Sequence, residues 1–436
     1  MLPRHFVVVG NSIAGIEAAI LLRTRDATAR ITVISAESDY PFARTALMYV
    51  FCGQLRMEDT EFHDRGLYER MGFKRIGARV VALDAESHML TLDTGATLTY
   101  ERLLLAVGSK ARRLPYPTAY DSPNVHHFVS MLDFQALNAA ARPGMRAAVI
   151  GGGLIGVEVA EVLHHRGLSV TWIVRDAWVG PVALDRREAT LVEDHVRRPG
   201  VDVRAGAGVR TLAPAKAFPG FTLDVDGKEL GVDLVVGATG VVPNTAFLEG
   251  SGVALAADGS VETGDDLQSI SAPDVFAAGD CACVTWADGS RGPETLWYTA
   301  RDQGRAAAAA MLGDPTKYRR GTWTNSAKFF DIEYTTAGFV PVAQQSGRQH
   351  PGGGRWQTWF QKHPSEAASL RIAIKDSRVV GFNALGRRWS TEVWLRWVQE
   401  RRPLEFVLAH LRESTFDEEL TNPFPVLPTA TLEEGA

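Results

Sequence analysis

The sequence is poor in cysteine, in net charge and in long apolar stretches. It has three cysteines in 436 residues, Cys52, Cys281 and Cys283, which are too few for a disulfide framework and fit a reducing compartment. Its net charge of −5 comes without a dense basic cluster, so nucleic acid is not an expected partner. No run of about 18 apolar residues exists, so we expect no transmembrane segment. No residue is assigned to a metal site. We expect a cytoplasmic protein, because the first predicted strand begins by residue 5 and leaves no room for a signal peptide.

What the chain does contain is one glycine-rich pattern in two copies. The first copy, Gly10–Gly15, follows a strand predicted at His5–Val9, and the second, Gly151–Gly156, follows the apolar run Ala147–Ile150. Each loop opens a helix, whose free backbone N–H groups and positive dipole end suit a pyrophosphate. One such loop is a weak signal, but two with the same order downstream predict that the chain binds two dinucleotides. The loop residues assigned to cofactor binding are Gly10, Ser12, Ala14, Gly15, Gly151, Gly153, Ile155 and Gly156.

The duplication extends to the scale of a domain. Each loop is followed by a helix, a second strand, meander strands and a buried closing strand that ends in glycine. The closing glycine Gly108 lies 98 residues after the first loop begins, and Gly240 lies 89 residues after the second begins. In the second copy we expect Val201–Arg204 and Phe221–Val225 to be meander strands. Both closing glycines are candidate cofactor contacts, as is Val81 in the first predicted meander.

Glu37 stands at the end of the second predicted strand, Ile31–Ile34, 27 residues after Gly10. A carboxylate at this place can accept both hydroxyl groups of an adenosine ribose. The alternative is an ordinary surface glutamate at a strand end. The preceding glycine loop favours ribose binding.

Five segments, which together cover essentially residues 5–310, carry a resemblance to a known family. They are the Gly10 loop with Glu37, Leu103–Gly108, Gly151–Glu158, Ala238–Gly240 with Pro243-Asn244, and Asp274–Asp280. This combination resembles the two-dinucleotide-binding-domain flavoproteins of the pyridine nucleotide–disulfide oxidoreductase superfamily. The resemblance implies FAD in the first unit, NADH or NADPH in the second, and Asp280 beside the FAD ribityl–pyrophosphate region. Two positions depart from the pattern, Ser12 for the middle glycine and Val107 for a threonine, and both are compatible with FAD.

The resemblance also implies a domain organisation. It predicts an α/β fold with two Rossmann-like domains of three-layer ββα type and a C-terminal α+β interface domain. The FAD-binding domain is expected to be discontinuous, at 1–112 and 244–325, with the NAD(P)H-binding domain at 113–243 and the interface domain at 326–420. The last residues, 421–436, carry three prolines and are expected to be mobile. The strands expected in the interface domain are Ala327–Tyr334, Trp356–Gln361, Leu370–Ile374 and Val379–Asn383, with a helix starting near Ser390.

The cysteines do not fit the redox thiols of this superfamily. In an alignment with its single-cysteine members, Thr45 falls at the nucleophile's place, and a hydroxyl group has no redox cycle. Cys52 lies seven residues later and is typical of a small buried residue. Cys281-Ala282-Cys283 follows Asp280, but the two cysteines are not expected to form a working redox pair. The sequence therefore predicts a flavoprotein that does not use a thiol.

The segment Pro41–Val50 resembles the ferredoxin- and rubredoxin-reductase branch and the flavin domain of nitrite reductases. That resemblance implies that Arg44 lies along the FAD. It also implies that Glu158 lies near the contact of nicotinamide and flavin. The lysine of that branch falls on Tyr49, which we predict to hydrogen-bond nearby, with a packed aromatic as the alternative. Glu158 and Tyr49 are the candidate catalytic residues.

Three further positions bear on the cofactors. Arg175 ends the second strand of the second copy and suits a 2′-phosphate, whereas the neighbouring Asp176 suits a bare ribose, so NADH and NADPH stay open. Lys328 and Phe329 resemble a family segment that approaches the flavin. The alternative is a strand with one exposed lysine.

The expected reaction is hydride transfer from NAD(P)H to FAD, followed by electron transfer to a second acceptor. A ferredoxin- or rubredoxin-type carrier protein is the favoured acceptor, and oxygen or a quinone is the alternative. A flavin-binding redox subunit or sensor is a different possibility. Trp389, Trp394 and Trp397 could form a membrane-surface face for a quinone reductase, although such a group is more often core or interface. The implied C-terminal domain favours a homodimer or a subunit of a complex.

Overall fold

The structure is a computed structural model that describes residues 3–216, 219–286, 289–314, 317–342, 355–417, 419, 421–428 and 430–434. The chain divides into two compact units. The first contains residues 1–112, 129–138 and 241–320, and the second contains residues 113–128, 139–240 and 321–436. The three-domain division remains a prediction.

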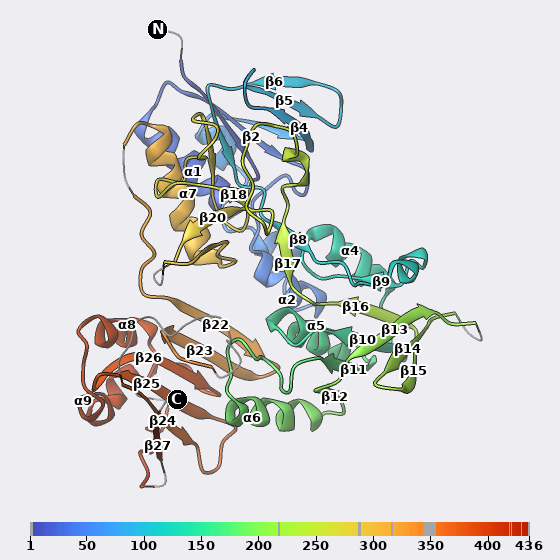
Figure 1. The fold of residues 1–436 in the computed structure, drawn as a ribbon, viewed down its shortest axis with the longest axis vertical. Coiled ribbons are helices and arrows are strands. Elements are labelled where there is room, and N and C mark those ends of the chain that lie inside the picture. Colours follow the sequence, from blue (N-terminus) through green and yellow to red (C-terminus); the bar gives the residue numbers. More distant parts are fainter. Residues whose placement is uncertain are drawn as a thin grey trace. The chain divides into compact units, whose positions relative to one another are not determined.

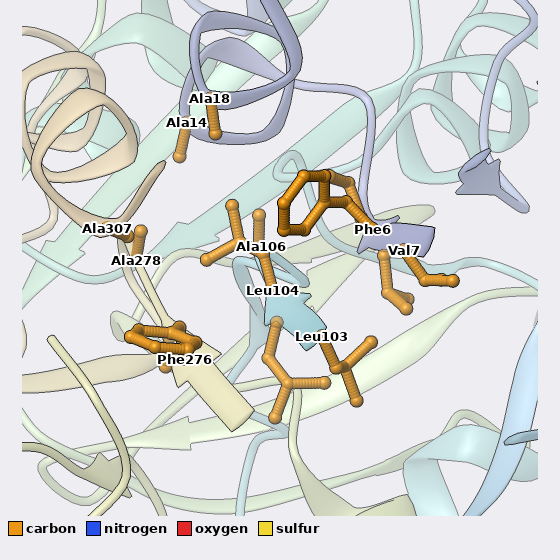
Figure 2. Close-up of a cluster of buried hydrophobic side chains, with 14 of the residues drawn as sticks. Phe6, Val7, Ala14, Ala18, Leu103, Leu104, Ala106, Phe276, Ala278 and Ala307 are labelled. Carbon is orange, nitrogen blue, oxygen red and sulfur yellow. The ribbon is translucent and has the colours of Figure 1, made fainter. Parts of the chain in front are cut away.

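The first unit is built on a five-stranded parallel sheet in the order β19-β7-β1-β2-β3. Figure 1 labels strand β2 of this sheet. Its strands β1, β7 and β19 are almost continuous apolar runs, as expected for strands that are covered on both faces. Figure 2 shows part of this core, where side chains of the sheet meet alanines of two helices. The elements are β1 (His5–Val9), β2 (Arg30–Ser35), β3 (Phe73–Gly77), β7 (Arg102–Leu105), β19 (Val275–Ala277), α1 (Ile13–Arg25) and α7 (Trp297–Met311).

Helices α1 and α7 pack very closely. A Cβ atom on Gly304 would lie 2.1 Å from the carbonyl oxygen of Ala14, so only glycine permits this approach. An antiparallel meander and two smaller sheets complete the unit. The meander consists of β4 (Val80–Asp84), β5 (Met89–Leu92) and β6 (Thr97–Thr99). The two smaller sheets consist of β8 (Ser109–Ala111) with β17 (Val241–Pro243), and of β18 (Val261–Glu262), β20 (Ala282–Thr285) and β21 (Arg291–Gly292). The first unit also contains the short helices α2 (Leu47–Phe51) and α3 (Leu67–Arg70).

The second unit contains a parallel sheet of the same design, in the order β12-β11-β10-β16-β9. The predicted order of first strand, helix, second strand and closing strand is thus confirmed in both copies. One assignment was wrong: the segment predicted as meander strand Val201–Arg204 is β12, which pairs in parallel with β11 at the sheet edge. A four-residue strand carries no sequence signal for its partner. The elements are β9 (Val125–His126), β10 (Arg146–Ile150), β11 (Ser169–Val174), β12 (Asp202–Ala205), β13 (Val209–Pro214), β14 (Phe221–Val225), β15 (Lys228–Val232), β16 (Leu234–Gly237), α5 (Leu154–His165) and α6 (Arg186–Arg197), and α4 (Met131–Ala140) begins in the first unit.

The C-terminal part of the second unit is an antiparallel sheet in the order β22-β23-β26-β25-β24-β27. The predicted single strand Ala327–Tyr334 was wrong, because the chain reverses at Phe330-Asp331, where Phe330 has a φ of 59°. The predicted helix near Ser390 is confirmed as α8. The elements are β22 (Thr324–Phe329), β23 (Ile332–Gly338), β24 (Trp356–Lys362), β25 (Ser369–Lys375), β26 (Arg378–Leu385), β27 (Thr431–Glu434), α8 (Thr391–Gln399) and α9 (Leu404–Ala409).

The segment 421–436, which the sequence predicts to be mobile, contains a strand. Residues Thr431–Glu434 form β27, which pairs with β24 and covers the edge of the sheet. The segment before β27 is also bound to β24, because the N–H of Leu427 donates to the side-chain oxygen of Gln361 at 2.8 Å. The open backbone groups of an edge strand explain this pairing, which proline content alone does not reveal.

The tryptophan group of the C-terminal sheet is core. Trp394 and Trp397 are 0% and 1% exposed, and Trp389 is buried with them. The rings of Phe382 and Trp394 stack with centroids 4.8 Å apart. The membrane-surface alternative is therefore wrong for these residues. Among the described residues, no helix is long and apolar enough to cross a bilayer.

Candidate functional site

The first glycine loop is held in a conformation that only glycine permits. Gly10 has a φ of 111°, and a Cβ atom there would lie 2.1 Å from the carbonyl oxygen of Ala106 at the end of β7. A Cβ atom on Gly15 would lie 1.9 Å from the carbonyl oxygen of Gly10. Ser12 begins α1 and its side chain makes no capping hydrogen bond. The first turn of α1 therefore keeps its N–H groups for a ligand.

The second loop repeats this geometry. Gly151 has a φ of 133°, and a Cβ atom there would lie 2.1 Å from the carbonyl oxygen of Ala238. A Cβ atom on Gly156 would meet the carbonyl oxygen of Gly151 at the same distance. A Cβ atom on Gly153 would meet nothing within 4 Å. Since Gly153 is the counterpart of Ser12, the serine in the first loop is sterically permitted.

The second loop has one support that the first lacks. The indole N–H of Trp172 on β11 donates to the carbonyl oxygen of Gly151 at 2.8 Å, and the Trp172 side chain is fully buried. The residue at the corresponding place on β2 is Val33, which has no donor. The sequence analysis missed Trp172. The sequence indicates this residue only as a tryptophan within the strand Ser169–Val174, at the place where the first copy has Val33.

Glu37 lies just beyond β2, as predicted, and is paired with Arg44. The two oxygens of the Glu37 carboxylate accept from the two Nη atoms of Arg44 at 2.8 and 2.7 Å. The backbone N–H of Met131 donates to Oε1 of Glu37 at 2.6 Å. Burial raises the pKa of Glu37, but the hydrogen bonds and charge of Arg44 outweigh it and hold the pKa below its usual value. A carboxylate has about four acceptor positions, so this arrangement leaves room for one ribose hydroxyl.

Arg44 also donates to the carbonyl oxygen of Val129 at 2.8 Å. Its guanidinium is thus fixed between Glu37 and the segment that enters α4. The spacing of seven residues between Glu37 and Arg44 gave no sign of this pair. The predicted placement of Arg44 along the FAD remains a prediction.

Asp280 follows β19 in the same unit. The hydroxyl of Ser109 donates to Oδ2 of Asp280 at 2.7 Å, and burial raises the pKa of this carboxyl. Gly108 has a φ of 64° and open space where a Cβ atom would stand. Val81 lies at a register irregularity between β4 and β5, with its side chain 43% exposed. The roles of these residues toward FAD remain predictions.

The sequence predicts no redox role for the three cysteines, and each of them is a free thiol that is at least partly buried. Cys281 is fully buried, its Sγ donates to the carbonyl oxygen of Leu105 at 3.2 Å, and burial raises its pKa to about 11. Cys283 is buried, Cys52 is partly buried beyond α2, and none of the three forms a disulfide. A buried thiol with a raised pKa is a poor nucleophile.

The predicted catalytic residue Glu158 lies on α5. Burial raises the pKa of Glu158 to about 7, and the charge of Glu161 adds to this effect. Tyr49 lies on α2 in the other unit, so its predicted proximity to Glu158 remains a prediction.

The remaining predicted positions lie in the second unit. Nζ of Lys328 on β22 is 2.6 Å from Oε1 of Glu161. Phe329 is 1% exposed and its ring packs edge-on against Tyr334. Arg175 is exposed at the end of β11, and Gly240 has open space where a Cβ atom would stand. Their cofactor contacts remain predictions.

Comparison with known proteins decides the family. Residues 4–304 match the family described as pyridine nucleotide-disulphide oxidoreductase. The chain belongs to this family. Among its curated relatives, the 5,5'-dehydrodivanillate O-demethylase ferredoxin reductase subunit of Sphingobium sp. is 33% identical over 77% of this chain and 82% of the relative. The NADH-dependent phenylglyoxylate dehydrogenase subunit epsilon of Aromatoleum evansii is 30% identical over 82% of each chain.

A solved structure of the family, the reductase of the covalent putidaredoxin reductase–putidaredoxin complex, superimposes with a TM-score of 0.80. It is 22% identical, with 93% of this chain and 95% of that chain covered, which shows the fold. The two loops fit the cofactors of the family, because two helices begin without a capping side chain beside glycines that no other residue can replace. The chain is an oxidoreductase that uses FAD and NAD(P)H.

Trp172→Phe tests the support of the second loop. We expect the KM for NAD(P)H to rise about threefold to tenfold, because one buried hydrogen bond to the loop is lost. The flavin content and the kcat should stay unchanged, since the first loop is untouched. Steady-state kinetics with saturating acceptor would measure both constants.

Trp394→Phe is the matched control. Trp394 is equally buried, but its Nε1 has no hydrogen-bond partner among the described residues. Its replacement should leave the KM for NAD(P)H unchanged. An equal rise of the KM in both variants would show that Trp172 acts only through general packing.

Proposed function

We propose that this protein is an FAD-dependent NAD(P)H reductase that delivers electrons to a ferredoxin- or rubredoxin-type carrier protein. When bound, the flavin accepts a hydride from NAD(P)H and releases its electrons singly. The observation that carries the proposal is the pair of glycine loops in a chain whose Cys281 and Cys283 are buried. A thiol route to the acceptor is thereby disfavoured. The relative from Sphingobium, a ferredoxin reductase subunit, supports the same acceptor class.

Within this function, the residues of the chain bind and orient. The loops at Gly10 and Gly151 would hold two pyrophosphates, and Glu37 would hold a ribose of FAD. Glu158 and Tyr49 would lie where nicotinamide meets flavin. The enzyme would work in the cytoplasm, which three cysteines in 436 residues support, and as a homodimer, which the type of C-terminal domain supports.

A second candidate is a redox subunit of a larger enzyme. It is favoured by the relative from Aromatoleum, which is a dehydrogenase subunit. A third candidate is an NAD(P)H oxidase or quinone reductase. The three candidates differ only in what reoxidises the flavin.

Anaerobic rapid mixing with NADH or NADPH would test the proposal. Flavin absorbance should bleach on mixing, and oxidised ferredoxin or rubredoxin should then restore it faster than oxygen or a soluble quinone does. The Cys52→Ser, Cys281→Ser, Cys283→Ser variant should behave like the parent, because no thiol takes part. Fast bleaching with no response to any carrier would support the redox subunit, and faster recovery with oxygen or quinone would support the third candidate.

A further inference from the structure

Two carboxyl groups and one ammonium group meet between α5 and β22. Glu158 and Glu161 are one helical turn apart on α5 and therefore share a face. Nζ of Lys328 lies 2.6 Å from Oε1 of Glu161, with exposed side-chain fractions of 27% and 16%. The other oxygen of Glu161, Oε2, is buried and has no hydrogen-bond partner among the described residues.

The other charged side chains near Glu158, Glu161 and Lys328 do not compensate the excess negative charge of the two carboxylates. Asp331 follows Lys328 in the turn of the hairpin and is itself paired with His195 of α6. His165 lies one turn further along α5, and its charge opposes that of Asp331 at Glu161. One ammonium group thus lies near two carboxyl groups, one of which, on Glu161, is only 16% exposed. Two carboxylates would repel each other there, so one of the two takes up a proton at a higher pH than usual.

We propose that Lys328 is a positioning residue that keeps Glu161 ionised and so makes Glu158 the carboxyl of the pair that carries the proton. The direct contact of Lys328 with Glu161 selects which carboxyl stays charged. Burial raises the pKa of both carboxyls. The ammonium group opposes this rise at both, by its charge alone at Glu158 and by its charge and a hydrogen bond at Glu161. The inference rests on the proposed function only for the consequence that this proton affects the reaction with NAD(P)H.

The holoenzyme tests the inference by infrared titration of the protonated carboxyl band, which Glu158→Gln identifies by removing it. In the parent the band should disappear around pH 7. In Lys328→Met the transition should move up by about one pH unit or more, because a positive neighbour is lost. In Glu161→Gln it should move down, because a negative neighbour is lost and Lys328 faces Glu158 alone. Lys328→Arg should keep the parent transition.

Opposite shifts in Lys328→Met and Glu161→Gln are a result that a merely structural role would not produce. Shifts in the same direction, or no shift in either variant, would overturn the inference. If Lys328→Met does not fold, the Glu161→Gln and Lys328→Arg arms still decide it.

The pH profile of flavin reduction by NAD(P)H, measured on the same variants, separates the two proposals. A profile that follows the infrared shifts supports both. Infrared shifts with an unchanged rate profile would retain the role of Lys328 and reject the placement of Glu158 beside the nicotinamide.

Discussion

Glu37→Arg should yield a purified protein without bound flavin. The variant loses the carboxylate that would hold a ribose hydroxyl, and it places a second guanidinium beside Arg44. It also removes the acceptor of the Met131 N–H, which lies 2.6 Å from Oε1 of Glu37 in the parent. Because like charges repel in a partly buried site, Arg44 is also expected to turn away. The ratio of flavin absorbance to protein absorbance after gel filtration would measure the loss.

Two further variants make this result interpretable. Glu86→Arg carries the same charge change at an exposed turn and should keep its full flavin content. Glu37→Gln retains one acceptor oxygen and should bind FAD more weakly than the parent but not lose it. Circular dichroism would establish that all three variants are folded. A folded Glu37→Arg protein with its full yellow colour would contradict the assignment of Glu37 to the ribose.

The duplicated framework could be predicted from the sequence because its signal is local: each glycine loop directly follows an apolar strand and opens a helix. Gly10 and Gly151 each combine a positive φ with a carbonyl contact that only glycine permits, and each follows an apolar strand. The same pattern of clashes at Gly15 and Gly156 makes the two loops recognisable as one design. Strand partners are not local, and this is why β12 was placed in the wrong sheet.

The pairs that shape the candidate site could not be predicted, because they join distant parts of the chain. Lys328 and Glu161 are 167 residues apart, and no spacing rule connects a strand of the C-terminal sheet to α5. Trp172 and the carbonyl of Gly151 are 21 residues apart and meet only because β10 and β11 lie side by side. The glycine loop and the following strand indicated Glu37, and the resemblance to the family supplied the positions of Arg44 and Glu158. It supplied none of their partners.

Arg371→Ala should lower the free energy of unfolding of the second unit by about 3–5 kcal/mol. Arg371 on β25 is 2% exposed and its Nη2 lies 2.8 Å from Oε2 of Glu188 on α6, whose side chain is fully buried. The amide of Asn383 donates to the other oxygen of Glu188 at 3.0 Å. Removal of the guanidinium leaves a buried carboxyl group with two neutral donors, the amide of Asn383 and the backbone N–H of Asp185. This pair also fastens the C-terminal sheet to α6, so the two parts should unfold at a lower denaturant concentration.

The effect of Arg371→Ala should depend on pH in a direction that the structure determines. Burial raises the pKa of Glu188 above its usual value of 4.5, and the charge of Arg371 opposes this rise. Without Arg371 the folded-state pKa rises further. A raised pKa contributes stability that is fully present below the unfolded value and is lost as the pH rises through the folded value. The deficit of the variant should therefore be largest at neutral pH and smallest near pH 4.5.

Denaturant unfolding at several pH values, followed by tryptophan fluorescence, would measure the deficit of Arg371→Ala. Arg378→Ala removes an exposed guanidinium at the start of β26 and should change stability by no more than about 0.5 kcal/mol. Adding Glu188→Leu to Arg371→Ala should restore part of the lost stability, because the buried charge is removed together with its partner. A deficit that is the same at every pH would show that lost packing, and not the unpaired carboxylate, is the cause.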